Sequence, residues 1–383
     1  MEKFGKAIYL NNAATAWPKA PGVPEAVAEC LSSLPEHPGR TAAPKNRSLD
    51  SCRMRLARLL GVERIDRLAL TQHATQALNI AILGIACQPN IEVVTSVLEH
   101  NSVLRPLARL KETRGLRLSI IGMTPQGDLD EDAFEKAVNR SPRLVVLNHA
   151  SNVTGQVLPV DRLFARAQQA GAITLLDASQ SLGQLPVKAA ALHADMIAFT
   201  GHKGLRGPEG TGGLYVREGL ELEQVFVGGT GVRSDLWLHP VEMPTRLEAG
   251  TPNMPAFAGL DVALGWYEAQ GEPFSVVAAA RAAQLREGLK CIPRVCLYES
   301  GKNGPDTNVV SFCIAGWGVE EAGYALAESF GVICRTGLHC APLIHDAIGS
   351  APEGTIRFSP SGATTEQEIS VAIAAVRRMA ECI

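Results

Sequence analysis

The chain has 383 residues, 46% of them hydrophobic, and a formal net charge of -3. This length exceeds that of a typical single domain, so we expect two domains of unequal size. Nucleic acids and anionic membranes attract proteins with a basic face, whereas this chain is slightly acidic and has no long block of like charge. The composition therefore argues against both as the main partner and favours a small-molecule substrate.

The N-terminal segment carries no recognisable targeting signal. Charged residues lead directly into the short apolar stretch Ile8-Tyr9-Leu10, without the apolar core or cleavage pattern of a signal peptide. No apolar run approaches the roughly 18–20 residues that span a bilayer. We expect a cytoplasmic protein in which the nine cysteines are mostly reduced and buried.

The cysteines and histidines do not follow a metal-binding spacing. No Cys-x-x-Cys pair occurs, and the cluster of His339, Cys340 and His345 matches no standard zinc site. The sequence therefore predicts no metal.

Short apolar runs alternate with helical patterns between residues 66 and 216. Helices are expected at Thr75–Ala86 and Asp161–Ala170. Several of the apolar runs are continuous, as in strands that are covered on both faces, so the pattern predicts an α/β domain with a mostly parallel, seven-stranded sheet. The expected strands are Leu68–Thr71, Glu92–Ser96, Leu116–Ile121, Leu144–Asn148, Ile173–Asp177, Met196–Thr200 and Gly213–Val216.

The pattern changes after a stretch rich in Gly, Pro and Thr, Gly228–Pro255, which we interpret as the exit from the large domain. A long helix, Ala256–Ala269, follows, and then two hairpin-like strands, Val295–Glu299 and Val309–Ile314. We expect a large domain at 16–254. A smaller α+β domain would comprise 1–15 together with 255–383.

Candidate site residues follow the expected strands, at the edge where ligands of parallel sheets bind. The strand Ile173–Asp177 ends in a carboxylate that either caps a following helix or keeps a pyridinium nitrogen of pyridoxal phosphate protonated. Gln180 is close enough in sequence to donate to the phenolic oxygen of the same ring. On Asp177 alone the two interpretations are evenly matched.

Lys203 lies in a glycine-rich turn directly after the apolar strand Met196–Thr200. A lysine that forms a Schiff base needs a lowered pKa, which burial or nearby cations provide. Thr200 and His202 are suited to hydrogen-bonding a phosphate. Most lysines lie on the surface, but this position makes Lys203 a candidate cofactor lysine.

Three further polar residues are weaker site candidates when each is considered alone. Thr75 lies where a strand meets a helix N-terminus, which favours an anion site. His100 could stack on a cofactor ring and move protons, or could be a loop histidine without a catalytic role. Asn152 could contact the cofactor or a substrate carboxylate, or could serve the turn alone.

These residues together resemble the class V aminotransferase family of fold-type I pyridoxal-phosphate enzymes, and within it the cysteine desulfurases and selenocysteine lyases. The matching motifs occur in family order over nearly the whole chain. They are Tyr9–Thr15, His73–Asn79, Glu99–Ser102, Ser151–Gly155, Asp177–Gln180, Thr200–Lys203, Glu248–Asn253, Arg335–Ala341 and Ile356–Ser359.

The resemblance implies the fold-type I architecture and a pyridoxal 5'-phosphate cofactor carried on Lys203. It implies that Arg357, with Asn152 and Ala14, binds the substrate, and that Thr251 reaches the phosphate of a second subunit in a homodimer. The cofactor-binding residues that it implies are Lys203, Ala74, Thr75, His100, Asn152, Asp177, Gln180, Thr200, His202 and Thr251.

The resemblance assigns catalysis to Lys203, His100 and Cys340. Cys340 would attack the sulfur of L-cysteine, giving L-alanine and an enzyme persulfide, because a thiolate is a strong nucleophile. The chain departs from the family pattern at Leu338 and Asn101, where histidines are usual. Cys340 and Arg357 lie 17 residues apart, a short spacing that resembles the branch requiring a sulfur-acceptor protein.

Other functions are compatible with parts of this pattern. Selenocysteine is a possible second substrate, and a class V aminotransferase or another lyase would use the same scaffold without needing Cys340. A non-catalytic cofactor-binding or sulfur-relay protein is disfavoured by the joint presence of Lys203, Asp177, Arg357 and Cys340. The glycines after Lys203 lack the Gly-Lys-Ser/Thr ending of a nucleotide-binding loop.

Overall fold

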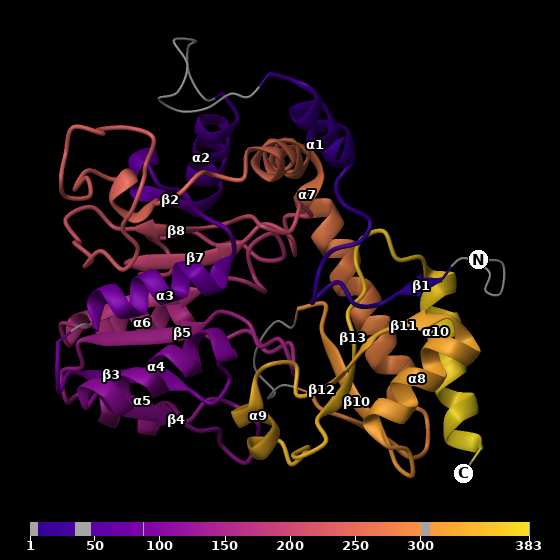
Figure 1. Cartoon of the computed structure of the whole chain (residues 1–383). Helices are drawn as coiled ribbons and strands as arrows, with labels where there is room; N and C mark the ends of the chain where they lie inside the picture. Colours follow the sequence, from indigo (N-terminus) through magenta and orange to yellow (C-terminus); the bar gives the residue numbers. More distant parts are fainter. Residues whose placement is uncertain (1–6, 35–46, 87, 300–306, 383) are drawn as a thin grey trace.

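The computed structural model describes residues 7–34, 47–86, 88–299 and 307–382. The elements from α2 to β8 gather around a large sheet, while β1 and the elements from β9 onward gather around a smaller one, and helix α7 runs alongside both (Figure 1). The large sheet contains β2 (Leu68–Thr71), β3 (Glu92–Ser96), β4 (Arg117–Ile121), β5 (Leu144–Asn148), β6 (Ile173–Asp177), β7 (Met196–Thr200) and β8 (Gly212–Val216).

The large sheet has the strand order β2-β8-β7-β6-β5-β3-β4. The neighbours from β4 to β7 pair in parallel, and β8 pairs antiparallel with both β7 and β2. The predicted mostly parallel, seven-stranded sheet is therefore confirmed. The expected strand bounds agree with the structure, except that β4 begins at Arg117 and β8 at Gly212.

Helices cover both faces of this sheet, because successive residues of its strands point to opposite sides. Leu144 and Val146 of β5 pack in a core with α3 (Ala74–Ile85) and α4 (Asn101–Arg114). Val145 and Leu147 pack in a second core on the other face. That face is covered by α2 (Arg47–Leu60), α5 (Glu131–Val138), α6 (Val160–Gln169) and the first part of α7 (Met254–Lys290).

Helix α7 is much longer than expected. It has 37 residues, whereas the sequence predicted an end at Ala269 because Gly271 and Pro273 usually terminate helices. The helix continues through Pro273 because both of its ends are buried: Phe257 belongs to the large core and Leu285 to the small one. No helix in the described part of the chain, α7 included, combines the length and apolarity needed to cross a membrane.

The smaller sheet has the order β12-β13-β10-β9 and is antiparallel. Its core also contains Ile8 and Leu10, and the N-terminal strand β1 pairs in parallel with β11. The two expected strands pair as predicted, but the first ends at Leu297 and the second begins at Val310. The remaining elements are β1 (Ile8–Tyr9), β9 (Val295–Leu297), β10 (Val310–Ile314), α8 (Val319–Phe330), β11 (Val332–Ile333), β12 (Arg335–Gly337), α9 (Pro342–Ala347), β13 (Thr355–Phe358), α10 (Glu366–Glu381), α1 (Val23–Ser32), η1 (Ile65–Arg67) and η2 (Thr245–Leu247).

The domain limits stay a prediction, although the pairing of β1 with β11 agrees with placing residues 1–15 beside the C-terminal part.

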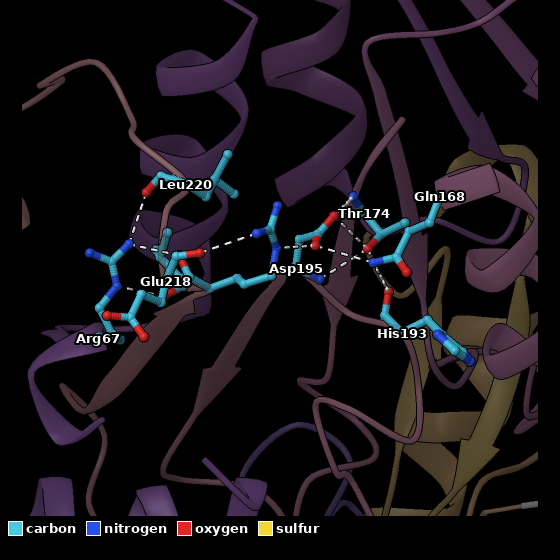
Figure 2. A network of polar contacts seen from close by, with 9 residues as sticks. Arg67, Gln168, Thr174, His193, Asp195, Glu218 and Leu220 are labelled. Atoms are coloured by element: carbon cyan, nitrogen blue, oxygen red, sulfur yellow. Dashed lines mark hydrogen bonds and ion pairs between the residues drawn. The ribbon is translucent and has the colours of Figure 1, made fainter. Parts of the chain in front are cut away.

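A polar network joins strands at the edge of the large sheet where β6 and β7 begin (Figure 2). Buried Asp195 accepts hydrogen bonds from Arg217 Nε at 2.6 Å and from the backbone N–H of Thr174 at 3.0 Å. Arg67 donates to the carbonyl oxygens of Val216 and Leu220. These contacts fix the strands at this edge, and the opposite edge carries the candidate site.

Two loops at that opposite edge approach closely at Gly183 and Gly204. A Cβ on Gly183 would lie 2.4 Å from the carbonyl carbon of Gly204, and the φ angle of Gly183 is +88°. Only glycine satisfies both constraints. The turn that contains Lys203 and Gly204 is therefore held against the segment that follows β6.

We predict that Gly183→Ala destabilises the protein far more than Gly171→Ala. Gly171 also has a positive φ, +83°, but an added Cβ meets no atom within 4 Å, so its substitution costs about 1–2 kcal/mol of backbone strain. The overlap at Gly183 adds about 1–3 kcal/mol more. Urea unfolding of the two variants measures the difference, and equal losses of stability would contradict the close approach.

Candidate active site

A cavity of about 230 Å³ lies at the carboxyl edge of the large sheet. It is lined by residues from the loops after β2, β3, β5, β6 and β7, from the N-terminal segment, and from β12 and β13 of the small sheet. The lining residues are Ala13, Ala14, His73, Ala74, Thr75, His100, Ser102, Asn148, Ala150, Asn152, Asp177, Ser179, Gln180, Thr200, His202, Lys203, Arg335 and Arg357.

The structure thus brings together most residues that the sequence singled out. Those in the cavity wall are Ala14, Ala74, Thr75, His100, Asn152, Asp177, Gln180, Thr200, His202, Lys203 and Arg357. Cys340 is not a lining residue, but its sulfur contacts Arg335, which is one. Thr251 is solvent-exposed and does not line the cavity of its own chain.

Asp177 presents its carboxylate at the end of β6. Its Oδ1 accepts hydrogen bonds from the backbone N–H of Ser179 at 2.9 Å and from the Ser179 hydroxyl at 2.5 Å. Turns, and not a helix, follow β6. The alternative of a helix cap is therefore wrong, and Asp177 instead braces a turn while lining the cavity.

Lys203 lies close to two other cationic side chains, Arg357 and Arg335. Burial, helped by Arg357 and Arg335 and opposed by Asp177, lowers the pKa of its amine to about 8. Because an ordinary lysine has a pKa near 10.5, the neutral amine of Lys203 is far more abundant at neutral pH. This is the form that attacks a carbonyl carbon.

Arg206 anchors the turn that follows Lys203. Its backbone N–H donates to the carbonyl of Lys203 at 2.8 Å, and its guanidinium lies over the rings of Trp266 and Phe274. It also donates to the carbonyl of Pro18. The turn is therefore tied both to α7 and to the N-terminal segment.

One end of the cavity is suited to a phosphate. The first turn of α3 offers unpaired backbone N–H groups at Ala74 and Thr75, where the helix dipole favours an anion. The Thr75 hydroxyl contacts the Ser102 hydroxyl at 2.7 Å. His202 contributes a buried Nδ1 with no hydrogen-bond partner among the described residues.

His100 is held as a neutral ring. Its Nδ1 accepts a hydrogen bond from the backbone N–H of Ser102 at 3.0 Å, so the proton of the neutral imidazole is assigned to Nε2. Burial lowers the pKa of His100 to about 4, although Asp177 opposes the shift. At neutral pH the ring can therefore accept a proton without first losing one.

Arg357 is fully buried beneath the cavity. Its Nη1 donates to the carbonyl of Asn152 at 2.9 Å, while its Nε has no partner among the described residues. Burial lowers its pKa to about 9, and the neighbouring Arg335 contributes. Asn152 likewise keeps a buried Oδ1 without a partner, since its Nδ2 donates to the carbonyl of His339. The free Nε donor of Arg357, a residue of the cavity wall, suits a small anionic group.

Cys340 lies in a constrained loop beside the cavity. His339 and Cys340 have φ angles of +49° and +61°, a conformation that is unfavourable for residues with a Cβ. The loop is held because Asn101 N–H donates to the carbonyl of Cys340 at 2.7 Å and His339 Nε2 lies 2.9 Å from the Thr355 hydroxyl. Arg335 Nη2 donates to the Cys340 sulfur at 3.3 Å.

Gln180 has a different contact from the one expected. Its Nε2 donates to the carbonyl of Ala13 at 3.0 Å. It therefore fastens the N-terminal segment over the cavity in this structure.

Sequence reasoning missed five lining residues with polar side chains: His73, Ser102, Asn148, Ser179 and Arg335. Ser102 and Arg335 lie inside motifs that were recognised, but the local sequence does not show which way their side chains point. Arg335 reaches the cavity because β12 pairs with β13, opposite Arg357. This pairing joins distant segments and is not visible in the local sequence.

Comparison with known proteins gives the family. The family model described as aminotransferase class-V matches residues 8–371, and the chain belongs to that family. A probable cysteine desulfurase from Methanothermobacter thermautotrophicus is 30% identical over 375 residues, which cover 95% of this chain and 92% of the relative. A cysteine desulfurase from Gluconacetobacter diazotrophicus is 32% identical, with 95% and 90% covered.

Not every relative has the same length. The chain spans 55% of a probable cysteine desulfurase from Mycolicibacterium paratuberculosis, at 30% identity over 98% of this chain. Among solved structures, the apo cysteine desulfurase from Thermococcus onnurineus matches with a TM-score of 0.91 and 29% identity, covering 98% of this chain and 95% of that one. These matches confirm the predicted family resemblance and the fold-type I architecture.

The family implies pyridoxal phosphate, and the cavity fits it. The helix terminus of α3 with the free Nδ1 of His202 suits the phosphate, Asp177 suits the ring nitrogen and Lys203 suits the aldehyde. Arg357 also lines the cavity, and its Nε, which has no partner among the described residues, suits a substrate carboxylate.

We predict that capture of pyridoxal phosphate by the apo-protein has a half-maximal rate near pH 8. The neutral amine of Lys203 reacts, and its abundance reaches one half at its pKa of about 8. Stopped-flow absorbance of the bound cofactor from pH 6 to 10 gives the midpoint. Because Asp177 raises this pKa, Asp177→Asn should move the midpoint lower. A midpoint near that of an ordinary lysine would contradict the prediction.

Proposed function

We propose that this chain is a cysteine desulfurase, which removes the sulfur of L-cysteine with pyridoxal phosphate and gives L-alanine and a persulfide on Cys340. The observation that carries the proposal is the 3.3 Å contact between Cys340 and Arg335, a residue of the cavity wall. A thiol in this position can meet a substrate held in the cavity. The similarity to the named cysteine desulfurases supports the same reaction.

In this proposal, residues of the large sheet bind the cofactor and residues on the small-sheet side bind the substrate. Lys203, Asp177, Gln180, Thr200 and His202 would hold the cofactor from the large sheet, with Ala74, Thr75 and His100 completing the site. When bound, pyridoxal phosphate acts as an electron sink for the substrate's reacting carbon atoms. Arg357, with Asn152 and Ala14, would hold the substrate's α-carboxylate from the small-sheet side. Its planar fork is suited to two parallel hydrogen bonds.

Proton and sulfur transfer would follow from the positions of His100 and Cys340. The neutral ring of His100 accepts and returns protons at the substrate, and the lowered pKa of Lys203 allows its amine to do the same. The Cys340 thiolate forms a bond to the substrate sulfur while the bond between that sulfur and Cβ breaks. A proton then reaches Cβ, so that one thiol and one cysteine yield one persulfide and one alanine.

L-selenocysteine is an alternative substrate, because the same contacts would hold its carboxylate and a selenium atom in place of sulfur. A class V aminotransferase or another lyase reaction would leave Cys340 without a role. We retain the desulfurase as the leading proposal because Arg335 contacts that thiol.

We predict that Cys340→Ala lowers production of alanine and sulfide from L-cysteine at least about 100-fold, because the attacking group is lost. The assay supplies a thiol reductant and quantifies both products. Cys340→Ala should keep the visible band of the bound cofactor, whereas Lys203→Ala should lose it. Cys291→Ala, at an exposed cysteine, is the matched control and should react at the wild-type rate.

A full rate for Cys340→Ala would disprove the persulfide step. A colourless wild-type protein after incubation with the cofactor would disprove the cofactor assignment.

We also propose a homodimer and a sulfur-acceptor protein as partners. Thr251 is exposed in one chain and would reach the phosphate of the other. The segment before it exposes an apolar group that isolated monomers rarely leave in water. Its members are Phe226, Val227, Val232, Leu236, Trp237, Leu238 and Val241.

We predict that Trp237→Glu converts the dimer to a monomer, since the Trp237 side chain is 98% exposed in one chain and would be buried between two. Analytical ultracentrifugation gives the mass of each variant. Leu34→Glu, at a leucine that is 92% exposed elsewhere, should leave the dimer unchanged. A wild-type monomer, or a dimer that tolerates Trp237→Glu, would contradict the assignment.

A further inference from the structure

Two cysteines lie opposite each other on the small sheet. Cys296 of β9 pairs with Cys313 of β10 in the antiparallel ladder, so their side chains share one face of the sheet. Cys296 is exposed and Cys313 partly buried. The Tyr298 hydroxyl lies 3.5 Å from the Cys313 sulfur.

The ladder geometry allows these sulfurs to be joined. Tyr298 N–H donates to the carbonyl of Ser311 at 2.9 Å, and Ala315 N–H donates to the carbonyl of Arg294 at 2.8 Å. Hydrogen-bonded pairs alternate along such a ladder, which makes Cys296 and Cys313 a hydrogen-bonded pair with Cα atoms about 5.5 Å apart. Disulfides join cysteines whose Cα atoms are about 4.4–6.8 Å apart.

The same geometry makes such a bond easy to reduce. In a disulfide the Cβ atoms approach to about 3.8 Å, so the two strands must draw together at this pair. Strained disulfides have higher reduction potentials and are the labile ones. In a reducing compartment, such as the one that the sequence predicts, the pair would therefore rest as two thiols and close only under oxidation.

We propose that Cys296 and Cys313 are a redox modification site that closes to a reversible disulfide in the presence of a low-molecular-weight disulfide. One cysteine thiolate attacks a sulfur of the reagent, forms a mixed disulfide and releases one thiol. The second cysteine thiolate then attacks the protein sulfur of that mixed disulfide and releases the second thiol. The protein loses two electrons and two protons, and the reagent leaves as two thiols.

The other described cysteines lack this arrangement. Cys291 and Cys382 are exposed, and neither has a cysteine as its cross-strand partner among the described strands. Cys52 is buried and burial raises its pKa well above the ordinary value. Its thiol is therefore protected. Cys291 is the matched control because it offers an exposed thiol without an opposing one.

The test is disulfide mapping of the full-length protein. The protein is incubated with glutathione disulfide at pH 8.5, where more thiol is ionised, and free thiols are then blocked with N-ethylmaleimide. Trypsin cleaves after Arg294, Lys302 and Arg335, and a second cleavage at Glu320 and Glu321 separates Cys313 from Cys334. We expect a cross-linked peptide pair containing Cys296 and Cys313, which a phosphine reductant separates.

The controls distinguish this pair from general thiol oxidation. Cys296→Ser and Cys313→Ser should each abolish the cross-link and leave a glutathione adduct on the remaining cysteine, whereas Cys291→Ser should leave the cross-link intact. Cys296 lies on an exposed strand position, so its variant tests the proposal even if Cys313→Ser fails to fold. Glutathione on Cys291 of the wild type without any cross-link between Cys296 and Cys313 would overturn the proposal. This result is independent of the desulfurase activity.

Discussion

The in-register ends of neighbouring parallel strands determine where the site lies. Asn148 at the end of β5 pairs with Asp177 at the end of β6, and Asp177 pairs with Ala198 of β7. Because parallel strands finish at one edge, loops that are far apart in the chain converge there. The network around Asp195 fixes the opposite edge, so the register that places Asp177 beside the Lys203 turn is held from both sides.

The site that results has more positive than negative charge. Lys203, Arg335 and Arg357 line the same cavity, and each arginine lowers the pKa of the Lys203 amine, whereas Asp177 in the same wall raises it. Glu99 is fully buried close by, and burial raises its pKa to about 8, so it is largely neutral. A phosphate, a carboxylate and a thiolate all relieve this repulsion. Holding these like charges close together lowers the stability of the folded protein, and bound anionic ligands stabilise it.

Much of the fold and the site could be predicted from sequence because the signals are local. Continuous apolar runs define most strands of the large sheet, and the polar last residues of β2, β3, β5, β6 and β7 mark the binding edge. Helix α7 could not be predicted in full, because burial of both ends outweighs the local effect of Gly271 and Pro273. Arg335 was missed since its direction depends on pairing between β12 and β13. The contact of Gln180 with Ala13 depends on a segment far away in the chain.

Helix α7 also limits how the chain can be divided. A cut between residues 254 and 255, at the boundary suggested by composition, falls at the first residue of the helix. A fragment ending there would lose Phe257 and Leu260 from the large core, and the remaining fragment would lack Ile8 and Leu10 from the small one. Neither piece would carry a complete core. The chain therefore cannot be divided there into two separately folding parts. A chimera that exchanges the part around one sheet with a relative must take α7 and the N-terminal strand β1 together.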